Sequence, residues 1–116
     1  MKKLFLLILL SIAFLSGCGG SSGGSSSPAV DANGNSAPTL ASISNQSTNE
    51  DTAKSVTLSG SDSDAGDTLT YAATSSTSNV TPSISGTTLT LTPAANWNGT
   101  ATISAKVNDG TVDSVT

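Results

Sequence analysis

The sequence predicts an all-β fold, a sandwich of short strands, on three observations. From about Pro38 onward, apolar and polar residues alternate in short runs, which is the period of a half-buried strand. No stretch of this region places its apolar residues at the 3.6-residue period of a helix. Turns that contain glycine, proline or asparagine separate the runs at close spacing, as they do in sandwiches of antiparallel strands.

The predicted strands follow one another with a turn signal between most neighbours. The clearest alternation occurs in four runs, at residues 54–59, 68–74, 88–92 and 100–107. Two weaker candidates lie at residues 40–43 and 80–84. The turn signals lie at residues 61–66, 85–86, 93–99 and 108–110. Ser85-Gly86, between Ile84 and Leu89, predicts a tight hairpin.

The core of this sandwich is predicted to be small. Valine, isoleucine and leucine fill it together with Tyr71 and Trp97, and alanine takes several inward positions. A domain of about 80 residues is near the lower limit of what one core stabilises without disulfides. Cys18 is the only cysteine, so an internal disulfide is excluded. A metal ion or a neighbouring domain makes physical sense as an additional staple.

The N-terminus has the pattern of a bacterial lipoprotein signal. Lys2 and Lys3 precede an apolar run at residues 4–15, which is too short for a spanning helix of about 20 residues. The run ends in Leu15-Ser16-Gly17-Cys18, which resembles a lipobox, where a diacylglycerol thioether is added to the cysteine and the chain is cut before it. We therefore expect a signal peptide at residues 1–17. The alternatives are an ordinary signal peptide with an incidental cysteine, or a short membrane anchor.

Residues 18–37 are predicted to be a lipidated, flexible tether that leads to a folded domain at residues 38–116. Residues 19–27 are nearly pure glycine and serine, a composition typical of random coil. Gly19 stands where an aspartate commonly signals retention in the inner membrane. The sequence therefore favours the outer membrane or the cell surface of a bacterial envelope.

The charge balance excludes one class of partner. The chain has 8 acidic residues, 4 basic residues and no histidine, for a net charge of −4. Loss of residues 1–17 leaves Lys54 and Lys106 as the only cations. A nucleic-acid-binding protein needs a basic footprint, so the expected partners are the membrane and other surface proteins or glycans. Carboxylates in excess also suit divalent cations, with plain solubility as the alternative.

The folded region resembles the cadherin-like, immunoglobulin-like tandem repeats of bacterial surface adhesins. The resemblance runs from Ala37 to Ser114 and rests on a series of short motifs in family order: Ala37-Pro38-Thr39, Asn49-Glu50-Asp51-Thr52, Ser61-Asp62-Ser63-Asp64-Ala65-Gly66-Asp67, Gly86-Thr87-Thr88-Leu89, Asn96-Trp97-Asn98-Gly99 and Asn108-Asp109-Gly110. It implies a Greek-key β-sandwich of the immunoglobulin/cadherin type and a role in adhesion.

The chain departs from these repeats at its C-terminal end. In the family, the Asn-Asp-Gly turn leads into a long last strand and then into the next repeat, whereas this sequence stops at Thr116 with one repeat. We therefore expect a truncated last strand. Either the chain is an N-terminal fragment of a larger repeat protein, or its sandwich is completed from elsewhere, because an open sheet edge invites another strand.

Acidic residues cluster in the predicted turn at residues 61–66 and just beyond it. Calcium takes six to eight oxygen ligands, and carboxylates at alternating positions suit it. The resemblance implies Glu50, Asp62 and Asp64 as calcium ligands, with Asp67 and Asp109 as contributors. Glu50 is expected to reach the same end of the sandwich. The alternative is that aspartate and glycine serve here only as turn residues.

Single residue types bear on two further functions, glycan binding and catalysis. Trp97, in a loop before the longest strand, is a candidate for stacking on a sugar, although such a tryptophan more often covers the end of a core. The sequence offers few side chains that could act as a nucleophile or a general base. The chain has no histidine, Cys18 is expected to be lipidated, and no serine has a base beside it in a motif. The chain is predicted not to be an enzyme.

The function predicted from the sequence is a lipid-anchored adhesion or structural module outside the cytoplasm, with calcium making its domain junction rigid. A carbohydrate-binding module that uses Trp97 and the loop carboxylates is the second possibility. A truncated product without independent function is the third.

Overall fold

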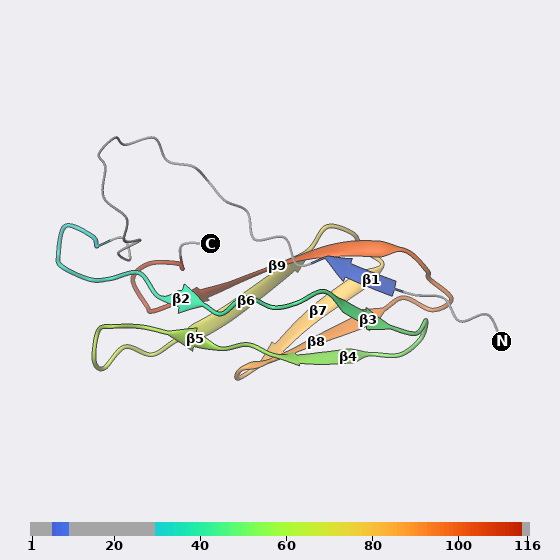
Figure 1. The fold of residues 1–116 in the computed structure, drawn as a ribbon, viewed down its shortest axis with the longest axis horizontal. Coiled ribbons are helices and arrows are strands. Elements are labelled where there is room, and N and C mark those ends of the chain that lie inside the picture. The colour runs from blue at the N-terminus through green and yellow to red at the C-terminus, as the bar shows by residue number, and fades with distance from the viewer. Residues whose placement is uncertain (1–5, 10–29, 115–116) are drawn as a thin grey trace.

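The computed structural model describes residues 6–9 and 30–114 (Figure 1). These residues form strands, turns and irregular segments, with no helix among them. In that part of the chain, nothing helical has the length and apolar character needed to cross a membrane. Cys18 and most of the predicted signal peptide and tether lie outside the described residues.

The strands form two main sheets that face each other. One contains β3 (Gln46–Thr48), β1 (Leu6–Leu9), β9 (Thr100–Asn108) and β6 (Thr70–Ser75), in that order. The other contains β4 (Lys54–Thr57), β8 (Thr88–Pro93) and β7 (Val80–Ser85). A short pair joins β2 (Thr39–Leu40) to β5 (Gly60–Ser61). The chain crosses from the first sheet to the second between β6 and β7, and returns between β8 and β9, which makes an all-β sandwich (Figure 1).

Alternation along β8 and β9 builds the core between these sheets. Leu89 and Leu91 face inward from β8, and Ala101 and Ile103 face inward from β9. Leu58 and Val80 complete the buried cluster. Because successive side chains of a strand point to opposite faces, the serines and threonines between these residues lie on the outer faces. The predicted strands at 54–59, 68–74, 80–84, 88–92 and 100–107 are confirmed within a few residues.

The predicted hairpin at Ser85-Gly86 is confirmed. Ser85 pairs with Thr88, which leaves Gly86 and Thr87 as the two turn residues. Gly86 has a φ of 58°, in the region that two-residue hairpins require and that glycine adopts at little cost. The tight turn fixes the register of β7 against β8 over all six residues of each strand.

Three strands were not predicted, and the 40–43 candidate is shorter than expected. β2 ends at Leu40, and β3 consists of Gln-Ser-Thr without an apolar alternation. β5 has only two residues, Gly60 and Ser61. β1 lies inside the apolar run that was assigned to the signal peptide, yet it pairs with β3 and β9. Backbone pairing, rather than side-chain pattern, defines these elements.

Gly60 is placed where no side chain fits. Its N–H donates a hydrogen bond of 3.0 Å to the Tyr71 hydroxyl. A Cβ atom at this position would lie 2.9 Å from the Tyr71 hydroxyl oxygen and 3.1 Å from Cγ2 of buried Val107. The ring of Tyr71 packs against the core cluster, so it has little room to move aside.

Substitution of Gly60 should therefore destabilise the domain. We expect Gly60→Ala to lower the free energy of unfolding by about 1–3 kcal/mol, the usual cost of overpacking. Ser61→Ala, at an exposed neighbour on the same strand, should change it by less than about 0.5 kcal/mol. Urea unfolding of both variants measures the difference. Equal stabilities for the two would contradict the close approach of Tyr71.

Candidate functional site

Three carboxylates meet at one end of the sandwich. Asp62 and Asp67 lie in the loop between β5 and β6, and Asp109 follows the last residue of β9. Each offers a carboxylate oxygen, and these oxygens lie within 4.8 Å of one another. The β6–β9 register explains the meeting, because Thr70 pairs with Asn108. The loop that enters β6 and the turn that leaves β9 must therefore share one end of the sheet.

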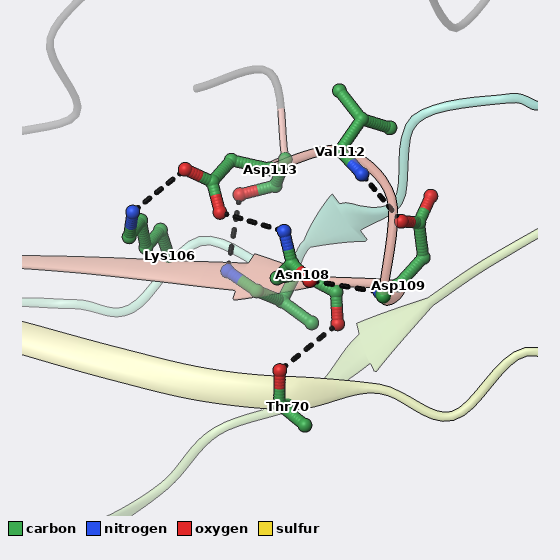
Figure 2. Close-up of polar contacts among 9 residues, drawn as sticks. Thr70, Lys106, Asn108, Asp109, Val112 and Asp113 are labelled. Atoms are coloured by element: carbon green, nitrogen blue, oxygen red, sulfur yellow. Dashed lines mark hydrogen bonds and ion pairs between the residues drawn. The ribbon is translucent and has the colours of Figure 1, made fainter.

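Asp109 is held in place by backbone donors. It is buried, with 6% of its surface exposed. Its Oδ1 accepts hydrogen bonds of 2.7 Å from the N–H groups of Thr111 and Val112, and its Oδ2 accepts one of 2.9 Å from Asn35 Nδ2. Figure 2 shows the Val112 contact within the turn. The Val112 bond, with help from Asn35 and Thr111, holds the pKa of Asp109 below 3.8 although burial opposes this.

Asp62 has one satisfied and one unsatisfied oxygen. Its Oδ1 accepts a hydrogen bond of 2.8 Å from the N–H of Asp64. Its Oδ2 is buried and has no hydrogen-bond partner among the described residues. Buried polar atoms are nearly always paired, so this carboxylate oxygen has room for a partner that the described residues do not supply.

Asp67 is exposed, and its environment opposes ionisation. Desolvation by the surrounding loop raises the pKa of the Asp67 carboxyl above 3.8, and the negative charges of Asp62, Asp109 and Asp64 raise it further. Of the two lysines among the described residues, Lys106 is bound elsewhere: its Nζ lies 2.6 Å from Asp113 Oδ2. The site therefore concentrates negative charge at close range.

A network beside the cluster supports the turn that carries Asp109 (Figure 2). Asp113 accepts hydrogen bonds from Lys106 and, at 3.0 Å, from Asn108 Nδ2. The Lys106 bond, followed by the Asn108 bond, lowers the pKa of Asp113. The N–H of Ser114 donates to the carbonyl of Val107 at 2.6 Å. Residues 113–114 are thus held against the end of β9.

The segment before the sandwich also reaches the end that carries Asp62, Asp67 and Asp109, called the acidic end below. Asn35 donates to Asp109, and the N–H of Ser36 donates to Asp64 Oδ2 at 2.6 Å. Asp31 caps the preceding turn, where its Oδ1 accepts the N–H groups of Asn33 and Asn35. The flexible tether was predicted to extend to residue 37, but from residue 30 the structure shows an ordered turn. The Asp31-Ala32-Asn33-Gly34 sequence is a turn signal that could have revealed it.

The structure brings together only part of the predicted ligand set. Asp62, Asp67 and Asp109 meet, and Asp64 lies beside them but bonds Ser36. The expectation that Glu50 reaches this end is wrong. Its neighbour Asp51 accepts the N–H of Asn96, so the β3–β4 turn lies with the β8–β9 loop, at the opposite end of the sandwich (Figure 1). β4 runs away from that turn, so the length of the strand separates Glu50 from the cluster.

Trp97 lies at the Glu50 end, away from the carboxylates. It is half-buried and packs against the core cluster. A Cβ atom on Gly99 would lie 2.8 Å from the Trp97 ring, so glycine is needed where the ring covers the backbone. Trp97 and the loop carboxylates, which were to form the glycan site together, are therefore not neighbours.

Comparison with known families gives one result. The bacterial Ig domain family matches residues 35–116, which is most of the chain and includes all three clustered aspartates. No curated protein and no solved structure matches the chain. The match begins at Asn35, the residue that bonds Asp109, so the ordered entry segment lies partly inside it.

Asp109 and Asp67, whose pKa values are shifted in opposite directions, should affect the stability of the fold in opposite directions. Asp109 has a lowered pKa in the folded state, so its carboxylate stabilises the fold above pH 3.8, and this is lost as the pH falls through the lower folded value. Asp67 has a raised pKa, so its ionisation destabilises the fold once the pH rises through that value.

We therefore expect Asp109→Asn to lower the melting temperature at pH 7 in chelator, and Asp67→Asn to raise it. Both differences should shrink at pH values below the folded pKa of the residue replaced. Melting curves of the two variants and the parent chain, recorded in steps from pH 7 into the acid range, measure this. A lower melting temperature for Asp67→Asn at pH 7 would show that the carboxylates do not repel one another in the folded state.

Proposed function

Because the chain belongs to the bacterial Ig domain family, we propose that it is a lipid-anchored structural or adhesion module outside the cytoplasm, and that Asp62, Asp67 and Asp109 bind calcium. Bacterial Ig domains typically serve as structural or adhesive modules without enzymatic activity. The observation that carries the calcium proposal is the buried, unpartnered Oδ2 of Asp62 within the carboxylate cluster.

The donor set fits calcium. Calcium is a hard cation that takes carboxylate and carbonyl oxygens in flexible geometry, whereas zinc in structural sites is bound mainly by cysteine and histidine. The cluster offers oxygen donors from three carboxylates, and the chain has no histidine. A divalent cation would supply the partner that Asp62 Oδ2 lacks and would offset the repulsion that raises the pKa of Asp67.

Calcium at this position would stiffen the entry to the domain. The three aspartates come from the β5–β6 loop and from the turn after β9, so one ion would join two segments that are distant in sequence. Asn35 bonds Asp109 and Ser36 bonds Asp64, so the entry segment is attached to the same group. This is the relation between ion and domain junction that the cadherin-like resemblance implies.

The proposed anchor is the diacylglycerol on Cys18, in the outer membrane or at the cell surface. The support is the lipobox at residues 15–18, with two lysines and an apolar run before it. Residues 18–29 as a flexible coil would have a typical span of roughly 20 Å. The ordered turn at residues 31–36 then makes the connection to the sandwich.

Calcium should stabilise the protein. A ligand at about 100 times its dissociation constant adds about 2.7 kcal/mol, which raises the melting temperature of a domain of this size by about 10–20 °C. We expect millimolar calcium to produce such a shift relative to chelator. Asp67→Asn should abolish the shift, and Glu50→Gln, at the opposite end of the sandwich, should retain it. An unchanged melting curve for the parent chain would refute calcium binding.

Cys18 should carry the lipid. In bacteria grown with a clickable fatty acid, we expect the parent chain to be labelled and to sediment with membranes. Cys18→Ala should lose the label and remain uncut, whereas Ser27→Ala, in the same predicted tether, should behave as the parent. Labelling that persists in Cys18→Ala would show that the lipobox interpretation is wrong.

A further inference from the structure

The edge of β9 that faces away from β6 is occupied by a strand from far away in the sequence. β1 runs parallel to β9, with Leu7, Ile8 and Leu9 opposite Thr100, Ala101 and Thr102. On its other side, β1 runs antiparallel to β3, with Leu6, Leu7 and Ile8 opposite Thr48, Ser47 and Gln46. β1 is therefore an inserted strand with a neighbour on each side (Figure 1).

The sheet needs a strand at this place. Neighbouring strands lie about 4.8 Å apart, so β3 and β9 on either side of β1 are about twice that distance from each other and cannot share hydrogen bonds. In the sheet order, β1 is the only neighbour of β3 among the described strands. Without an inserted strand, the facing backbone groups of both β3 and β9 would lose their partners.

The register shows which positions of an inserted strand face the core. Ile8 is opposite Ala101, whose side chain is fully buried. Residues two apart share a face, so Leu6 and Ile8 occupy core-face positions, and Leu7 and Leu9 occupy outer-face positions. The residues opposite Leu7 agree with this assignment, because both Ser47 and Thr100 are exposed.

A crevice between the two main sheets borders the core-face side of this place. Its lining is mostly apolar and comes from both sheets: Ile43, Ser44, Gln46, Val56, Leu89, Leu91 and Ile103. Gln46 is the β3 residue opposite Ile8, and Ile103 is two residues beyond Ala101. An inserted strand with apolar residues at the two core-face positions therefore suits the place, whereas the outer-face positions make no such demand.

We propose that the gap between β3 and β9 is an acceptor site for an apolar extended strand that runs parallel to β9. Leu6–Leu9 fills it in the uncut chain. Once the chain has been cut before Cys18, which is part of the proposed function, the site takes up an apolar strand of a partner protein by β-strand addition. Among the described residues of a second copy, the apolar residues of β7, β8 and β9 are buried in that copy's own core and are not free to fill the site.

The test uses the full chain with Cys18→Ser, which keeps the leader in place whatever the fate of the native cysteine. Leu7→Pro together with Ile8→Pro removes backbone donors from β1 and should release it. The probe is a fluorescent peptide of residues 2–9, whose lysines aid solubility. We expect it to bind the proline variant one to one and at least ten-fold more tightly than the chain with intact β1, whose own strand competes intramolecularly.

Two altered peptides test the facing of the strand. A peptide with Leu6→Asp and Ile8→Asp should lose binding by at least ten-fold, because both positions face the core. A peptide with Leu7→Ser and Leu9→Ser should bind within about three-fold of the parent. Equal binding of both altered peptides, or no binding of the parent peptide to a folded proline variant, would overturn the proposal. If the proline variant is unfolded by circular dichroism, the parent peptide should restore its structure, and failure to do so would also overturn it.

Cysteine pairs in the uncut chain give an independent measurement. With Cys18→Ser present, Leu7→Cys should form a disulfide with Ser47→Cys, its partner in the antiparallel register. The matched control is Leu7→Cys with Ser55→Cys, an equally exposed position on β4 in the other sheet, which should stay reduced. Disulfide formation in both pairs, or in neither, would contradict the strand insertion. None of these readouts depends on lipidation, cleavage or calcium.

Discussion

The pairing of β6 with β9 is the constraint on which the rest of this structure depends. Six residue pairs hold the two strands antiparallel, from Thr70 opposite Asn108 to Ser75 opposite Ile103. A shift of one residue would turn every side chain of β9 to the other face and expose Ala101, Ile103 and Val107 together. The buried face of β9 therefore selects the register, and the register in turn decides which loops meet at each end of the sandwich.

The acidic end is a consequence of that register with a cost in stability. Asp109 is positioned by backbone donors, so its carboxylate would need little rearrangement to bind the proposed ion. Asp67 brings a further charge that the fold disfavours. A core that contains few large side chains has little stability in reserve for such repulsion. The Asp67 carboxylate, which weakens the isolated domain, would strengthen it with the proposed cation bound, and the rigidity of the domain would then depend on the surrounding medium.

The sequence predicts those parts of the fold that depend on side-chain period. β9 and β8 alternate because one face of each is buried, and that signal is local. β3 and β5 carry no such signal, because they are short and polar and exist only through their partners. Asp62, Asp67 and Asp109 can be recognised from the order of the family motifs. The expected position of Glu50 was wrong because it depends on the direction in which β4 runs, and no local sequence pattern indicates that direction. The insertion of β1 is even harder to predict from the local sequence, because an apolar run is equally typical of a leader and of a strand.

The docking of the entry segment has a mechanical consequence. The chain enters the sandwich at Asn35 and Ser36 and is last described at Ser114, and the hydrogen bonds of all three residues place them at the acidic end. Tension between Val30 and Ser114 would load the contacts of this end one after another, in an unzipping geometry. It would not load all strands at once in shear. The first bonds to bear the load would be those of Asp64, Asp109 and Asp113. A few carboxylate contacts would therefore open before the load reaches the hydrophobic core.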